Sequence, residues 1–357
     1  MTNPDPDFLA RLLGEPGPSG FEERPARLWR QEAATFAEEV WSDVHGNAFA
    51  AVGRERRPRI MLAGHLDEIG VQITHVDEKG FCYFDGIGGW DSQVLVGQRI
   101  RLMGREGDVV GVVGKKPIHL MRPEERDKVS KIRDLWVDVG ATSRDEVKEM
   151  GLRVGDAGVL DSGFVRLAGD RVASRAIDNR VGAWVVLEAL RLLSEDPAPH
   201  AGCIAVGTVQ EEIGYSGGGA RSSAFSLEPD AALVVDVTFS TDVPDASPKE
   251  TGEHRLGGGP VISRGSATHP LVVDRLTDSA EEAEIEHTLM AAPRASRTDA
   301  DGIFLVRSGV PTGIVSIPNR YMHSPSEMVS RADLENAARL LAAFVRGLEA
   351  DASFVRE

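Results

Sequence analysis

Five short polar stretches of this 357-residue sequence carry side chains that can bind metal ions. Four of the stretches follow short apolar runs, and the fifth lies at the start of a predicted helix. In an open α/β sheet, ligand sites form beyond the carboxyl ends of the strands, so we expect these stretches to converge in space. The candidate side chains are those of His65, Asp67, Asp178, Glu211, Glu212, Asp236 and His323.

Together, the candidates offer two imidazoles and several carboxylates, and no thiolate is among them. This donor set suits zinc, cobalt or manganese better than calcium or an iron–sulfur cluster. Two divalent ions bring four positive charges, so three ligating carboxylates would leave one positive charge to favour a bound hydroxide. The residue types therefore predict a site for two divalent metal ions.

Each candidate also has an ordinary structural interpretation when it is taken alone. His65 and Asp67 could form a hydrogen-bonded pair in a loop, and Asp178 could cap the helix that follows it. The other candidates could be solvated loop or turn residues. Chance rarely places five such stretches at converging ends of strands and helices in one chain, so the combined pattern favours the metal site.

Predicted strands and helices alternate outside a central region of the chain. Short apolar runs predict buried strands at residues 59–63, 203–209, 231–237 and 313–317. Amphipathic patterns predict helices near residues 8–13, from about residue 22, at 180–193, near 274–287 and after residue 330. Ser330 can cap the last helix, with Asp333 at its third position. This alternation indicates an α/β fold with a mainly parallel sheet sandwiched by helices.

Residues 70–167 have a different character, with short alternating segments that are punctuated by glycine. They predict a small β-rich, barrel-like domain inserted into a catalytic domain of residues 1–69 and 168–357. Residues 121–132 are charged and lack a pattern, so we expect a mobile loop there. Trp90, Leu95, Val96 and Trp136 are apolar or aromatic residues that a small β domain does not bury fully, so we expect the insertion to build subunit contacts.

The overall composition excludes several classes of partner. The sequence has 40 Lys and Arg against 56 Asp and Glu, and the net charge of −16 repels nucleic acid and anionic lipid. No apolar run approaches the roughly 18 residues of a membrane span. Cys82 and Cys203 are the only cysteines, and both lie in strand-like segments, which favours a reducing compartment. We therefore expect a cytoplasmic protein with no nucleic-acid or membrane partner.

The polar stretches resemble the motifs of a family of dinuclear-metal aminopeptidases, which includes glutamyl aminopeptidases and endoglucanase-like proteins and is known for tetrahedral particles. The motifs span nearly the whole chain in the order of that family. They are Gly64-His-Leu-Asp-Glu-Ile-Gly70, Ala176-Ile-Asp-Asn-Arg180, Gln210-Glu-Glu-Ile-Gly214, Val235-Asp-Val-Thr238 and Tyr321-Met-His-Ser-Pro325. Residues 117–126 and 138–142 also resemble parts of the inserted domain of that family. The resemblance implies a zinc-peptidase-like fold for the α/β part.

The resemblance also implies a ligand set for two metal ions. Asp178 would bridge both ions, and His65 and Asp236 would bind one of them. Glu212 and His323 would bind the other ion.

Two further roles and one departure follow from the same resemblance. Glu211 would be the general base that takes a proton from a water bridging the ions, and Asp67 would orient His65. Many members of the family have Asp after the bridging Asp, whereas this chain has Asn179. The backbone next to the bridging ligand must therefore be supported in a different way.

The resemblance thus implies a metal-dependent aminopeptidase that hydrolyses the N-terminal bonds of peptides. Each subunit would hold two divalent ions, zinc or cobalt with manganese as a further option, and the subunits would form a dodecamer built from dimers. A dinuclear-metal amide deacylase is an alternative, because the same metal geometry serves that reaction. A non-catalytic scaffold particle would require a damaged ligand set, and a glycosidase normally uses two carboxylates without metal.

Overall fold

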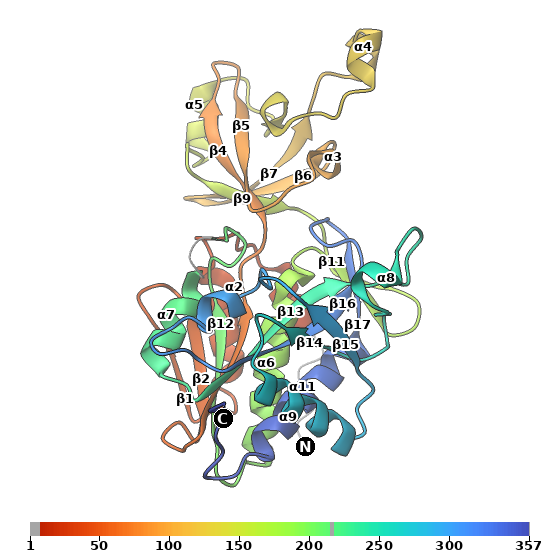
Figure 1. Cartoon of the computed structure of the whole chain (residues 1–357). Coiled ribbons are helices and arrows are strands. Elements are labelled where there is room, and N and C mark those ends of the chain that lie inside the picture. Colours follow the sequence, from red (N-terminus) through yellow and green to blue (C-terminus); the bar gives the residue numbers. More distant parts are fainter. Residues whose placement is uncertain (1–7, 215–217, 357) are drawn as a thin grey trace.

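The computed structural model describes residues 8–214 and 218–356, and its largest element is an eight-stranded sheet. A closed barrel lies to one side of the carboxyl edge of this sheet (Figure 1). In the order in which they lie, the sheet strands are β1 (Glu39–Ser42), β2 (Ala48–Val52), β12 (Gly202–Thr208), β3 (Arg59–His65), β13 (Ala231–Phe239), β16 (Thr312–Asn319), β14 (Val261–Gly265) and β15 (Thr288–Ala292).

The four central strands, β12, β3, β13 and β16, run parallel to one another. They correspond to the four strands that the apolar runs predict, so the expected α/β fold is confirmed. One boundary differs, because β13 continues beyond Asp236 to Phe239 and pairs Asp236 with Ser316. Asp236 therefore lies inside a strand, and its neighbours on β16 help to fix its position.

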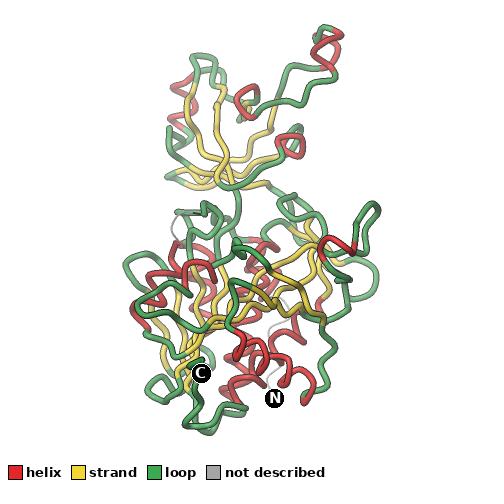
Figure 2. Tube along the Cα trace, in the orientation of Figure 1, coloured by secondary structure: helices red, strands yellow, loops and turns green. Residues whose placement is uncertain are grey.

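Helices cover both faces of the sheet, which explains why its strands are apolar without alternation (Figure 2). One face carries α1 (Phe8–Gly14), α2 (Glu23–Ala33), α6 (Ile177–Glu195), α9 (Pro270–Glu282) and α11 (Arg331–Arg346). The other face carries α7 (Gly218–Leu227) and α10 (Ala300–Ile303). The short helix α8 (Pro248–Thr251) lies between β13 and β14.

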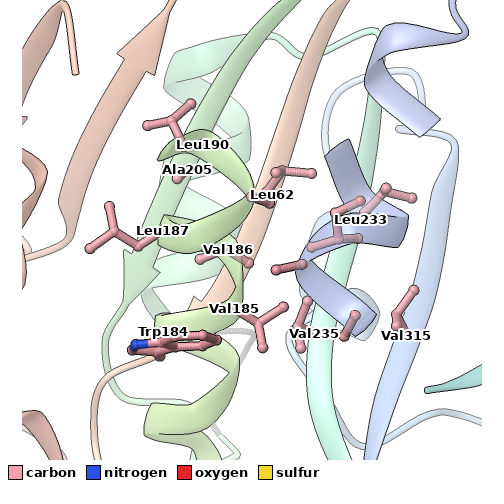
Figure 3. Close-up of a cluster of buried hydrophobic side chains, with 14 of the residues drawn as sticks. Leu62, Trp184, Val185, Val186, Leu187, Leu190, Ala205, Leu233, Val235 and Val315 are labelled. Carbon is pink, nitrogen blue, oxygen red and sulfur yellow. The ribbon is translucent and has the colours of Figure 1, made fainter. Parts of the chain in front are cut away.

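The central helix α6 packs along the parallel strands and is buried over most of its length. In Figure 3, Trp184, Val185 and Leu190 of α6 belong to one cluster with Leu62 and Leu233 of the neighbouring strands. Burying large apolar side chains contributes roughly 1.5–3 kcal/mol each. This packing holds the beginning of α6 at a fixed place beside the strand ends.

The segment from Gly70 to Leu160 forms a closed six-stranded barrel with its own apolar core. Its strands, in barrel order, are β4 (Gly70–Val76), β5 (Phe81–Ile87), β8 (Trp136–Asp138), β7 (Gly107–Gly114), β6 (Arg99–Gly104) and β9 (Ala157–Leu160). Two helices, α3 (Ser92–Leu95) and α5 (Arg144–Glu149), pack around it. The expected β-rich, barrel-like insertion is confirmed, whereas the boundaries at residues 70 and 167 remain a prediction.

Short helical turns lie in and beside the segment expected to be a mobile loop, residues 121–132. They are η1 (Ile118–Leu120), α4 (Pro123–Arg126) and η2 (Ile132–Asp134), and α4 projects away from the barrel in Figure 1. Most residues of this segment are exposed, as its charge predicts. After it, the chain forms a small antiparallel sheet of β10 (Val165–Arg166), β11 (Arg171–Ser174) and β17 (Glu327–Ser330).

Three of the four residues that we expected the barrel not to bury fully are partly exposed. Leu95 is fully buried in the barrel core, and Trp90, Val96 and Trp136 are half-buried. Larger exposed fractions belong to other apolar side chains of the barrel, among them those of Val110, Val112, Ile118, Leu120 and Val129, on β7 and the segment after it, and that of Val154.

The helix expected near residues 274–287 is displaced in the structure. It begins at Pro270 and ends at Glu282, and the following residues turn into the edge strand β15. Proline is favoured in the first turn of a helix, because its fixed φ suits a helix and its missing N–H has no partner there. Glu284, at φ 52°, then redirects the chain. The amphipathic pattern alone did not reveal either boundary.

The expected capping of the last helix by Ser330 is also wrong. Ser330 lies at the N-cap of α11 but makes no side-chain cap bond, and its hydroxyl donates to Asp170 Oδ2 at 2.5 Å. Asp170 instead accepts from the backbone N–H of Ala332, at 3.1 Å. Asp333 accepts from the N–H groups of Gly257 and Gly259, both at 2.8 Å. A carboxylate from a distant turn thus caps this helix.

Asn179 fixes the beginning of α6 to the sheet. Its side chain is fully buried, Nδ2 donates to the carbonyl oxygen of Val235 at 2.7 Å, and Oδ1 accepts from the N–H of Gly182 at 3.1 Å. The backbone at Asp178 and Asn179 is not helical, and the peptide bond between them is cis. An amide supplies both a donor and an acceptor, whereas an ionised carboxylate in this place has no proton to donate to the carbonyl.

We therefore predict that Asn179→Asp destabilises the metal-free protein in a pH-dependent way. An ionised carboxylate against the Val235 carbonyl loses a buried hydrogen bond, which costs about 1–3 kcal/mol. Protonation restores the donor, so the loss is absent at low pH and grows as the pH rises through the raised pKa of the introduced group. Thermal unfolding at pH 5 and pH 8 measures this difference.

The control for this prediction is Asn336→Asp, at a partly exposed position of α11. It should change the unfolding temperature little at either pH. An unfolding temperature of Asn179→Asp that differs from the wild type by the same amount at pH 5 and pH 8 would contradict the assignment of the Val235 bond.

Candidate metal centre

The carboxyl ends of the central strands bring the candidate side chains to one region. His65 is the last residue of β3, and it lies opposite Thr208, the last residue of β12. Glu211 and Glu212 follow β12, and His323 follows β16. The beginning of α6 adds Asp178, and β13 adds Asp236. This is the convergence that the order of strands and polar stretches predicts.

Asp178 lies between the two candidate histidines. Its Oδ1 is 3.4 Å from Nε2 of His65, and its Oδ2 is 3.4 Å from Nε2 of His323. The same Nε2 of His323 is 3.3 Å from Oε2 of Glu212. One ligand atom each from His65, Asp178 and Glu212 lie within 4.8 Å of one another. A carboxylate that faces two imidazoles with separate oxygens has the geometry of a bridging ligand.

Glu211 and Asp236 line the cavity next to this cluster. Oε2 of Glu211 is 3.7 Å from Nε2 of His65. Both acidic residues border a cavity of about 1200 Å³, together with Asp178 and Glu212. The cavity is large enough for a peptide end, and Glu211 is placed between it and the histidine.

Asp67 connects the first histidine with the loop that carries the two glutamates. Its Oδ1 is 3.2 Å from Nδ1 of His65 and accepts from the N–H of Glu211 at 3.2 Å. Its Oδ2 accepts from the N–H of Glu212 at 3.0 Å and from the hydroxyl of Ser19 at 2.6 Å. Burial opposes its ionisation, but the contact with His65 and the other hydrogen bonds keep the pKa of Asp67 below its usual value.

The sequence analysis missed Glu327, which holds the backbone of two candidates. Its carboxylate accepts from the N–H of Asp178 at 2.9 Å and from the N–H of His323 at 2.8 Å. Glu327 is buried and lies on β17, four residues after His323. Its place just beyond the last motif was the available signal.

A second missed group is a buried ionic cluster behind the site. Glu68 contacts the guanidinium groups of Arg175 and Arg180, and the distance to Arg180 is 2.8 Å. Arg180 has no exposed surface and also donates to the carbonyl oxygens of Leu66 and Leu12, at 3.0 and 2.9 Å. These contacts satisfy the charges, which buried ion pairs require. Glu68 and Arg180 both lie inside the quoted motifs, so the sequence contained their signal.

Burial and crowding shift the pKa values of the candidate acids. Burial raises the pKa of Glu211 to about 10, and that of Glu212 to about 7 with the charge of Asp178 adding to the rise. Burial also opposes ionisation of Asp178, but hydrogen bonds from both histidines lower its pKa to about 2. Hydrogen bonds to Asp178 and Glu212 raise the pKa of His323 to about 11. Positive charge close to these carboxylates therefore stabilises their ionised forms.

The residues present fit a divalent metal ion. Among the described residues, Oε1 of Glu212 is one of a few buried side-chain atoms without a hydrogen-bond partner. A buried carboxylate oxygen without a donor is costly unless a cation binds it. Imidazole nitrogen and carboxylate oxygen together suit zinc, cobalt or manganese.

The loop of residues 297–301 forms part of the wall of the same cavity. Arg297, Thr298 and Asp301 line it, whereas the segment 257–266 contributes only Ser263. Asp299 is a further missed residue, because it is buried and its Oδ1 has no partner. Its Oδ2 accepts from the hydroxyl of Thr208 at 2.5 Å.

Comparison with known proteins places these features in a family. A sequence model of the M42 glutamyl aminopeptidases matches residues 46–340. The chain is 36% identical over 350 residues to a lysyl aminopeptidase of Pyrococcus furiosus, covering 97% of this chain and 98% of that protein.

Solved structures agree with this match. A TET aminopeptidase from a marine-sediment Thaumarchaeota archaeon superposes with a TM-score of 0.91 at 34% identity, covering 96% of both chains. The TET1 peptidase of Pyrococcus horikoshii superposes with a TM-score of 0.84 at 30% identity, covering 96% of this chain and 99% of that one. The expected family is thereby confirmed: this chain belongs to the M42 glutamyl aminopeptidases.

Proposed function

We propose that this protein is an aminopeptidase that uses two divalent metal ions to hydrolyse the N-terminal bond of peptides. The observation that carries the proposal is the position of Asp178 between His65 and His323, with a separate oxygen facing each ring. Zinc and cobalt suit this donor set, with manganese as a further option. Family membership supports the peptidase activity.

The proposed ligands form two groups that share Asp178. His65 and Asp236 would hold one ion, because both border Asp178 from the β3 and β13 side of the site. Glu212 and His323 would hold the other ion, since they contact each other and His323 contacts Asp178. Oε1 of Glu212 has no hydrogen-bond partner, so it would be available to ligate such an ion.

In the proposed mechanism, bound ions would lower the pKa of a water molecule and polarise the scissile carbonyl. Glu211 would take the proton of the attacking water and return it to the leaving amine. Its burial supports this role, because a desolvated carboxylate has a high proton affinity. Asp67 would hold the ring of His65 and, through its N–H bonds, the backbone that presents Glu211.

The acidic cavity also fits one end of a peptide. Asp178, Glu211, Glu212 and Asp236 all border it, so a positively charged α-amino group would be attracted to this wall. The cavity extends beyond these residues, which leaves space for the peptide on the other side of the scissile bond. We therefore propose peptide substrates with a free N-terminus.

We propose further that residues 70–167 build the contacts of a homo-oligomer, a dodecamer made from dimers. Val110 and Val112 lie on one strand of the barrel, and their exposed fractions are 50% and 49%. Apolar surface of this kind is typical of interfaces. The TET1 peptidase of Pyrococcus horikoshii can assemble into a tetrahedron or a large octahedral shell, and a dodecamer of it has been crystallised.

We also propose a cytoplasmic location. Cys82 and Cys203 are both buried and free, as a reducing compartment favours. Among the described residues, none of the helices combines the length and apolar character that a membrane span requires.

The first prediction from this proposal concerns removal of the metal. The metal-free protein should be inactive, and zinc or cobalt should restore the release of a chromophore from aminoacyl substrates. Calcium is the control, because its preference for oxygen ligands does not match a site with two histidines. Elemental analysis measures the metal content in parallel. Full activity of a protein that contains no metal would refute the proposal.

A second prediction concerns the end of the substrate that is recognised. Peptides with a free α-amino group should lose residues one at a time, because the acidic wall attracts the ammonium group. The same peptides with an N-terminal acetyl group should be stable. Mass spectrometry over a time course distinguishes the products. Comparable cleavage of both forms would indicate an endopeptidase or an amide deacylase.

The third prediction separates the base from its neighbouring ligand. Glu211→Gln should retain both ions and lower turnover by roughly two to four powers of ten, the usual contribution of a general base. Glu212→Gln should weaken metal binding instead, because it removes a ligand charge. Turnover and metal stoichiometry are measured for both variants. The reverse pattern would mean that the two assignments must be exchanged.

A further inference from the structure

The barrel contacts the candidate metal centre through the loop that follows β5. Nδ1 of His323 lies 2.8 Å from the carbonyl oxygen of Gly89. A carbonyl oxygen can only accept, so Nδ1 of His323 is the donor. This bond leaves Nε2 as the ring atom that faces Asp178 and Glu212. We propose that the barrel loop, residues 88–91, positions His323 for metal binding and thereby controls the affinity of one of the two ions.

This inference rests on the proposed function, because it assigns a role to His323 as a ligand. The barrel loop lies against both proposed ligands of the same ion. A Cβ atom built on Gly88 would be 3.4 Å from the carbonyl oxygen of Glu212, and one built on Gly89 would be 3.5 Å from Nδ1 of His323. Gly89 is thus a positioning residue, and it acts through its backbone.

Two features hold the barrel loop in place. Gly88 has φ +76°, and a Cβ atom there would be 2.6 Å from Cγ2 of Ile69, so glycine is required at this position. The indole Nε1 of Trp90 donates to the carbonyl oxygen of Gly70 at 2.6 Å. The loop is therefore fixed to the first strand of the barrel, close to where the chain leaves the α/β sheet.

The two candidate histidines differ in how they are held. The side chain of His65 is 1% exposed, and its Nδ1 faces Asp67, which follows β3 in the α/β part of the chain. The side chain of His323 is 32% exposed, so its ring has room to rotate, and the Gly89 bond comes from the barrel. Displacement of the barrel loop should therefore affect the ion at Glu212 and His323 and leave the other ion unchanged.

The experiment compares Gly88→Ala with Gly97→Ala in the full chain. Both glycines lie in the barrel region at similar φ values, +76° and +80°, but a Cβ atom on Gly97 has no neighbour within 4 Å. Zinc affinity of each site is measured by competition with a chromophoric chelator, and the visible spectrum of cobalt reports the ligand geometry. Gly88→Ala should lower the zinc affinity of one site about 10–100-fold, the usual effect of losing a group that orients a ligand. Gly97→Ala should leave both affinities unchanged.

The weakened ion is identified in a His323→Ala background, where Gly88→Ala should have no further effect on the remaining ion. Trp90→Phe is the second variant, because it keeps an aromatic ring and removes the donor to Gly70. If Gly88→Ala does not fold, Trp90→Phe is measured in its place, and it should weaken the binding of the same ion.

Two results would overturn the inference: unchanged affinities in both loop variants, or equal weakening of both ions. In either case a wild type that binds two ions would leave the proposed function standing. A wild type that binds no ion would overturn the proposed function itself.

Discussion

The candidate site depends on the crowding of carboxylates that the parallel strands and the beginning of α6 place at one edge of the sheet. Asp178, Glu211, Glu212 and Asp236 share one cavity wall and are largely removed from water. Burial disfavours the ionised form of each, and each negative charge disfavours the next. Only cations or bound protons can relieve this condition. The hydrophobic packing of α6 against the sheet keeps the groups together in spite of their repulsion.

The charge of another buried carboxylate, next to the site, is neutralised by arginines of the protein itself. Glu68 is equally buried, but Arg175 and Arg180 neutralise it from within the protein. Among the described residues, Asp178, Glu211 and Glu212 make their ion-pair contacts at the cavity with the imidazoles of His65 and His323. This contrast between a neutralised acid and its neighbours supports the proposal that the cavity accepts external cations.

The sequence predicted the sheet and the convergence of the candidates, because buried parallel strands leave continuous apolar runs and their ends must meet. It did not predict contacts made by the backbone of a distant segment. The carbonyl of Gly89 has no sequence signal for its contact with His323, since every residue carries the same group. The predicted capping of the last helix was wrong for a related reason. The cap of α11 comes from Asp170, far away in sequence, whereas local rules consider only the residues beside the helix.

The contacts of Arg180 also join segments that are synthesised at different times. Its guanidinium donates to the carbonyl oxygen of Leu12, 168 residues earlier, so this hydrogen bond of the first helix forms only when the middle of the chain is available. The last candidate ligand, His323, lies later still, near the end of the 357 residues. Long-range contacts of this kind delay folding until most of the chain exists. A ribosome-bound fragment that ends before His323 therefore lacks one of the seven candidate side chains, and the complete set exists only after residue 323 has been synthesised.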